Sequence, residues 1–93
     1  MTTEREQLEL AAKACGADFR SYLDCGLWNA LMNDGDCARM EAALNIELTW
    51  FFDRVDALAC DVAPVVEYFA DHNGDKNAAR RAASLAVAVG CFL

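Results

Sequence analysis

The spacing of apolar side chains switches along this chain from a helical period to a period of two and back, and this limits the fold more than any other feature. In residues 46–53 apolar and polar side chains alternate, which is the pattern of a β-strand with one buried face. On either side, apolar residues recur every three or four positions, as in amphipathic helices. The chain therefore needs a fold in which helices and strands share one core.

Capping signals indicate three helices. Each follows a residue whose side chain can accept hydrogen bonds from free backbone amides, and two of them stop at a glycine. The expected helices span about residues 3–15, 37–45 and 75–89. In the last one the buried side is expected to consist of Ala78, Ala82, Leu85, Ala86 and Val89.

The remaining segments are expected to form strands and loops. A short extended stretch passes through Phe19, Tyr22 and Leu23 toward a loop that Trp28 anchors. Besides the strand at 46–53, a strand is expected after Pro64 at 65–69, and a weaker signal covers 55–60. Short connections favour an antiparallel sheet of three to four strands packed with the three helices. The sequence predicts a single α+β domain over residues 1–93, in the order α-β-α-β-β-(β)-α.

Composition places the chain among globular proteins. Apolar residues make up 56 % and charged residues 25 % of the 93 residues, enough for one core. Charged side chains near the start interrupt any signal-peptide pattern, and no apolar run is long enough to cross a bilayer. The five cysteines are odd in number and widely spaced, as in reduced cytosolic proteins. We therefore expect a cytoplasmic protein without membrane association.

Acidic residues dominate the charge. The net charge is −7, and residues 46–74 carry six acidic side chains against one basic. Nucleic-acid binding depends on Lys and Arg that neutralise phosphates, so a direct nucleic-acid partner is not expected. An acidic surface favours a basic protein surface as the partner.

Chemical motifs are scarce. His72 is the only histidine, it lies in a polar turn, and no nucleophile stands beside it in sequence. The Asp-x-Asn-x-Asp pattern at 71–75 resembles a calcium loop, but Ala82 stands where a bidentate glutamate should close it. A turn that caps the last helix explains the same residues. We expect no enzyme activity, no catalytic residue, no metal site and no cofactor.

Two groups of side chains leave alternatives open. Alternation puts Trp50 and Phe52 on the core side of their strand, although consecutive aromatics also suit a platform on which bases stack. Phe51 points the other way, either covered by a second layer of helices or exposed as a contact.

The helix macrodipole disfavours cations in the first half of the last helix, so its basic side chains should pair with carboxylates such as Asp71 or Glu67, or form a basic patch. These side chains are Lys76, Arg80 and Arg81.

Three segments resemble small phage and prophage proteins of the phage ABA-sandwich type. They are the Glu6–Cys15 helix, the Leu27–Asp36 segment followed by Ala38-Arg39-Met40, and the Asn77–Ala82 helix. Ala30 and Asn33 depart from the middle motif of that family, and residues 53–72 do not align with it.

The resemblance implies a bacteriophage or prophage origin, a host cytoplasm, and a sandwich with helices on both faces of the sheet. It implies no established activity. Trp28, Asn29 and the Asp34–Asp36 turn are then either a shared structural clasp or a binding element.

Together these features suggest a non-enzymatic phage accessory protein that binds and inhibits a host protein complex, for example in CRISPR defence. The candidate contacts with the partner are Glu47, Phe51, Asp53, Asp56 and Glu67. The alternatives are a small-ligand or nucleotide-sequestering protein that uses Arg80 and Arg81, and a phage structural or assembly protein. A homo-oligomer is compatible with each of these functions.

Overall fold

The α+β prediction is confirmed. The structure is a computed structural model that describes residues 3–92. Its elements are α1 (Glu4–Cys15), α2 (Ala17–Asp24), α3 (Asp34–Leu44), β1 (Glu47–Trp50), β2 (Arg54–Leu58), β3 (Val65–Tyr68), the 3-10 helix η1 (Phe69–His72) and α4 (Lys76–Phe92). The strands form one antiparallel sheet in the order β1-β2-β3.

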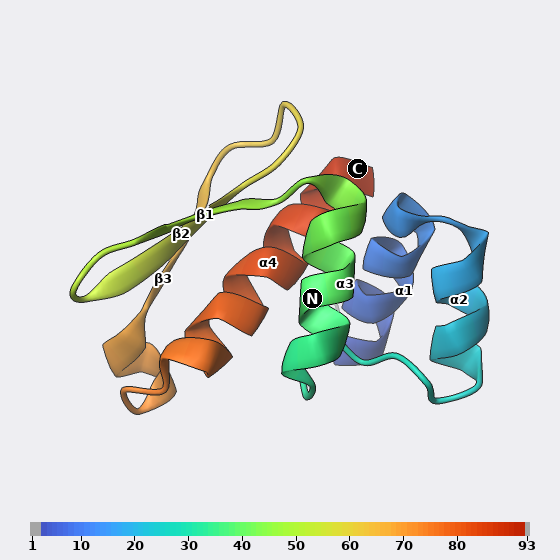
Figure 1. Cartoon of the computed structure of the whole chain (residues 1–93), viewed down its shortest axis with the longest axis horizontal. Helices are drawn as coiled ribbons and strands as arrows, with labels where there is room; N and C mark the ends of the chain where they lie inside the picture. The colour runs from blue at the N-terminus through green and yellow to red at the C-terminus, as the bar shows by residue number, and fades with distance from the viewer. Residues whose placement is uncertain (1–2, 93) are drawn as a thin grey trace.

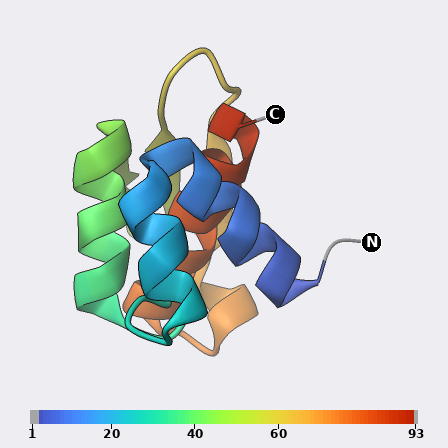
Figure 2. The ribbon, with the colours of Figure 1, turned by 90° about the vertical axis from the view of Figure 1, so that its right-hand side faces the viewer.

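The molecule is layered, with the sheet at one end. Figure 1 shows the sheet at the left, α4 beside it, then α3 and α1, and α2 at the far right. Figure 2, viewed from that right-hand side, has α1, α2 and α3 in front of α4 and the strands. Within residues 3–92 no helix covers the sheet face that points away from α4. The helices on both faces that the family resemblance implies are therefore not found in this part of the chain.

Helix α2 corrects the sequence prediction, which placed a short strand there. Phe19 and Leu23 are four residues apart, which is helical spacing, and both contribute to the core between the helices. Gly16 has a φ of 125°, which only glycine adopts without strain, and this lets α2 follow α1 directly. The observed order is therefore α-α-α-β-β-β-α, with four helices instead of three.

Helix α4 is the central element, and its buried surface is wider than predicted. One side, with Leu85 and Ala88, packs into a core between the four helices. Another side, with Ala79, Ala83 and Val87, packs on the sheet. The sequence analysis expected one buried stripe of apolar residues, and this was wrong because α4 lies between two layers. Ala86, which was assigned to that stripe, is exposed.

Capping side chains begin α1, α3 and α4 as expected, although α3 begins at Asp34 instead of residue 37. The predicted stop of the last helix at Gly90 was wrong, because Gly90 keeps a helical backbone and α4 continues to Phe92. The Thr3 hydroxyl accepts a hydrogen bond from the Glu6 amide, which begins α1. Asn33 begins α3 in the same way, by accepting from the Asp36 amide at 2.9 Å. The Asp75 carboxylate accepts from the amides of Asn77 and Ala78 and so begins α4. The turn before α4 is thus a helix cap, as predicted.

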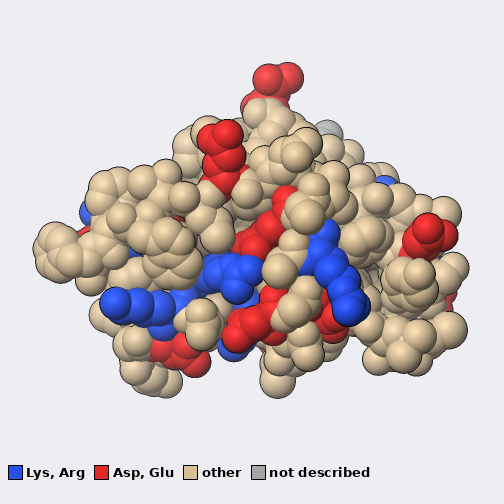
Figure 3. Space-filling view, viewed as in Figure 1, with Lys and Arg blue, Asp and Glu red and all other residues tan. Residues whose placement is uncertain are grey.

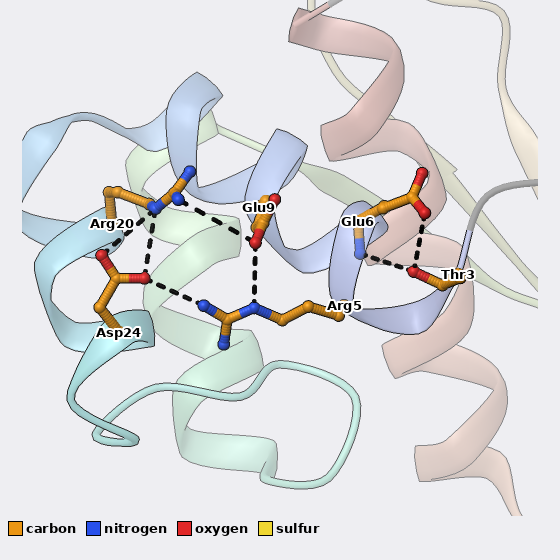
Figure 4. Close-up of polar contacts among 6 residues, drawn as sticks. All are labelled: Thr3, Arg5, Glu6, Glu9, Arg20 and Asp24. Carbon is orange, nitrogen blue, oxygen red and sulfur yellow. Dashed lines mark hydrogen bonds and ion pairs between the residues drawn. The ribbon is translucent and has the colours of Figure 1, made fainter.

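An exposed ion-pair network joins α1 to α2 (Figure 4). Arg5 lies between Glu9 at 3.1 Å and Asp24 at 3.0 Å, and Arg20 pairs with the same Asp24 at 3.3 Å. Because these side chains are largely solvated, each pair contributes at most about 1 kcal/mol to stability. The packing of the apolar core, rather than this network, holds α1 and α2 together.

Candidate interaction surface

The open face of the sheet, defined as the face directed away from α4, carries an exposed apolar cluster. Val55 and Ala57 of the central strand are fully buried against α4, so alternation directs Arg54, Asp56 and Leu58 to the open face. Cross-strand pairing adds Glu47 and Thr49 from β1 and Val66 and Tyr68 from β3. The large exposed apolar side chains on this face are Phe51, Leu58, Val66 and Tyr68.

The β1–β2 hairpin extends this cluster at one end of the sheet. The Phe51 amide donates to the Arg54 carbonyl at 2.8 Å, so Phe52 and Asp53 form a two-residue turn. Phe52 stands at the tip and is 94 % exposed. At this exposure the Phe52 ring makes few packing contacts within the protein, and it can contact another molecule.

Arg54 forms most of the polar contacts at the hairpin end of the open face, and its role there was not predicted from the sequence. Its guanidinium lies 4.0 Å from the centroid of the Phe51 ring, a cation–π contact. It also forms ion pairs with Asp53 at 3.2 Å and Asp56 at 3.5 Å. The buried Asp56 Oδ1 has no hydrogen bond, so this looser contact with Arg54 is its only charge partner among the described residues. The sequence signal for this cation–π contact was the position of Arg54 three residues after Phe51, across a tight turn.

The structure brings together only part of the predicted contact set. Glu47, Phe51 and Asp56 share the open face, and Asp53 lies at its end in the hairpin turn. Glu67 pairs with Val55 and so lies on the opposite face, where its carboxylate is 3.7 Å from the His72 imidazole. Arg54 forms ion pairs with both Asp53 and Asp56, one positive charge against two negative ones. Among the described residues Glu47 forms no ion pair.

Trp50 and Phe52 were predicted to lie in the core, and this was wrong. The strand ends at Trp50, so the alternation on which the prediction rested does not continue to Phe52. Trp50 does point to the α4 side, where its ring is 6.1 Å from that of Phe69. It lies at the edge of the helix layer and remains 48 % exposed.

Two of the three basic residues of α4, Arg80 and Arg81, are paired as expected, but with carboxylates of α3. Lys76 lies instead over the Phe69 ring, 5.6 Å from its centroid. Arg80 donates to both carboxylate oxygens of Glu41, and Arg81 pairs with Asp34 and donates to the Leu31 carbonyl at 2.8 Å. Asp71 and Glu67, the partners suggested from the sequence, do not contribute to these pairs. Both guanidinium groups are thus engaged between α3 and α4, away from any pocket between helix and sheet.

Glu41 also accepts a hydrogen bond from the buried Ser84 hydroxyl at 2.6 Å. The hydrogen bond to Glu41 raises the pKa of Arg80 above its ordinary value. Burial, with the Glu41 charge second, raises the pKa of the neighbouring Cys37 thiol to about 12. Cys37 is therefore a protonated core thiol at neutral pH, which is a poor nucleophile.

The Trp28 segment forms the contacts expected of a structural clasp, one of the two alternatives for these residues. Trp28 is buried, its Nε1 donates to the Asp36 carbonyl at 3.0 Å, and Phe19 packs against it edge to face. The Asp36 carboxylate accepts from the Asn29 amide at 3.0 Å. These bonds fix the loop between α2 and α3. A hollow of about 310 Å³ lies beside it, lined by Glu4, Arg5, Leu8, Leu23, Gly26, Trp28 and Asn29.

Charges of both signs are interleaved over α3 and α4. Figure 3 shows this mixture on the face toward the viewer, whereas the hairpin end at the left is mostly uncharged. On this face the acidic side chains do not gather into one patch. The open sheet face differs in combining four exposed apolar side chains with the charged residues Glu47, Arg54 and Asp56.

Comparisons with known proteins identify no relative of this chain. No protein-family model matches the sequence, and neither the curated proteins nor the solved structures provide a match. No helix in residues 3–92 combines the length and apolarity that crossing a bilayer requires.

Proposed function

We propose that this protein is a non-enzymatic binding protein that docks on a protein partner through the open face of its sheet. The observation that carries the proposal is the exposed cluster of Phe51, Leu58, Val66 and Tyr68 on a face that no described helix covers. Exposed apolar side chains gathered on one face with a polar surround are typical of interaction sites. Phe51, Tyr68 and the hairpin-tip Phe52 are the expected anchors, because buried aromatic side chains dominate interface energetics.

The chemistry of the partner follows from charge. The protein carries a net charge of −7, and Glu47 at the margin of the cluster has no ion pair among the described residues. The partner is therefore a basic protein whose contact area is apolar at its centre. Complementary charge at the rim accelerates association and makes it sensitive to salt.

The biological setting comes from the family resemblance and is part of the proposal. A phage or prophage protein of this size acts in the cytoplasm of the bacterial host. Proteins that bind nucleic acid have basic surfaces, so host defence complexes such as CRISPR effectors are the class of target we propose. The protein would inhibit such a complex by occupying that surface. The ligand-sequestering alternative gains no support, because Arg80 and Arg81 are held by α3.

A quantitative pulldown with matched variants tests this function. Tyr68 on the open face and Tyr22 on α2 are 47 % and 49 % exposed, so each can be truncated to alanine with a similar loss of surface. Tagged wild type, Tyr68→Ala and Tyr22→Ala are incubated with bacterial host lysate at low and high salt. We expect a basic partner that Tyr22→Ala retains and Tyr68→Ala loses at least about 30-fold, the effect of a hot-spot residue.

Two results would overturn the proposal. The first is equal retention of the partner by the two tyrosine variants. The second is a concentration-dependent dimer that buries the open face, seen by sedimentation as a Tyr68→Ala variant that becomes monomeric. The latter would assign the surface to a second copy of the chain.

A further inference from the structure

Cys60 and Cys91 lie together where the β2–β3 loop meets the end of α4. Ala59, Val62 and Cys91 belong to one apolar cluster, and Cys60 directly follows Ala59. The loop is in close contact with the helix: a Cβ added to Gly90 would lie 2.6 Å from Val62 Cγ1. The two thiols come from segments 31 positions apart in sequence, brought into proximity by this packing.

The backbone and the surroundings of the two thiols differ. Cys60 is exposed and has a φ of 55°, which is unusual for a residue with a side chain. Cys91 is half-buried, and burial, with the neighbouring Cys60 thiol second and Cys15 third, raises its pKa to about 11. Cys60 is thus the more accessible thiol, and Cys91 is the less accessible one.

From this placement we infer that Cys60 and Cys91 are an oxidisable pair that closes to an intramolecular disulfide and fastens the β2–β3 loop to the end of α4. The oxidant is a small disulfide of the glutathione type. The Cys60 thiolate attacks one of its sulfurs, the S–S bond breaks, and one reduced thiol leaves. The Cys91 thiolate then attacks Cys60 Sγ and releases the second thiol. The protein loses two electrons and two protons, and the oxidant becomes two thiols.

The test is disulfide mapping of the full chain after incubation with oxidised glutathione. The incubation is carried out at mildly alkaline pH, because only thiolates attack and burial raises the pKa of Cys91 to about 11. Remaining thiols are then blocked and the protein is cleaved with trypsin. Trypsin separates the relevant cysteines, since Cys60 falls in the peptide 55–76, Cys91 in 82–93 and Cys15 in 14–20.

We expect the linked peptide pair 55–76 and 82–93 as the main product. Cys60→Ser should remove this product. Cys25→Ser, which changes an exposed cysteine at the end of α2, should leave it. Gly90→Ala changes no thiol but displaces Val62 and its loop, so it should lower the rate of closure several-fold. A main product that joins Cys91 to Cys15, or a glutathione adduct on Cys60 that does not resolve, would overturn the inference.

Discussion

Glu41 is the less exposed of the two carboxylates that join α3 to arginines of α4, and this leads to a quantitative prediction for Glu41→Ala. Glu41 accepts two hydrogen bonds from Arg80 and one from Ser84. The side chains of Glu41 and Arg80 are 11 % and 18 % exposed, so water replaces little of what the substitution removes. The variant leaves a largely buried cation and a fully buried hydroxyl without their acceptor.

Breaking a buried ion pair from one side costs about 3–5 kcal/mol. Because Arg80 retains some contact with solvent, we expect the lower end, about 3 kcal/mol of unfolding free energy. For a domain of this size that corresponds to a fall in Tm of about 12–24 °C. Urea unfolding followed by far-UV circular dichroism gives the free energy directly, and a calorimetric scan gives the Tm.

The matched control is Glu9→Ala on α1. Glu9 pairs with Arg5 at 3.1 Å, but the Arg5 side chain is 52 % exposed. The loss of unfolding free energy should therefore stay below about 1 kcal/mol. The double variant Glu41→Ala/Arg80→Ala should cost less than the sum of the single variants, by about 2 kcal/mol. Equal losses for Glu41→Ala and Glu9→Ala, or additivity in the double variant, would refute the role assigned to this pair.

Other predictions concern the caps, the clasp and the acidic rim of the open face. Asp75→Ala removes the acceptor that begins α4 and should destabilise the protein by about 1 kcal/mol in urea unfolding. Trp28→Phe keeps an aromatic ring but leaves the Asp36 carbonyl without its donor; the expected cost is about 1–3 kcal/mol, and full stability would exclude the clasp. Glu47→Lys should leave the Tm unchanged but slow association with the partner and alter its salt dependence, as measured by surface plasmon resonance.

Local signals predicted the capping residues well, but they placed the start of α3 and the end of α4 three residues away from the observed positions and missed α2. Thr3, Asn33 and Asp75 all cap helices, because capping depends on residues only a few positions apart. Helix α2 was missed because Phe19 and Leu23 were read as part of an extended segment, although their spacing of four is also helical. The position of α4 between two layers depends on packing between distant segments, which the period of one helix does not encode.

Only part of the candidate surface could be predicted, because the rest again depends on contacts between distant segments. Alternation correctly separated Phe51 from the core side of β1, and Phe51 is indeed exposed. The prediction for Phe52 failed because the strand ends two residues earlier, at the hairpin. The contributions of Val66 and Tyr68 from β3 depend on strand pairing, which a single sequence does not specify.

Photo-crosslinking from the open face tests the proposed docking surface most directly. A photoreactive residue replaces Leu58 on the open face in one variant and Leu27 on the helical end in the other; both leucines are exposed. Each variant is irradiated in bacterial host cells and its adducts are identified by mass spectrometry. We predict that position 58 crosslinks a basic host protein and position 27 does not. Crosslinking of that protein from position 27 alone, or of only a second copy of the chain from position 58, would contradict the proposed docking on a host protein.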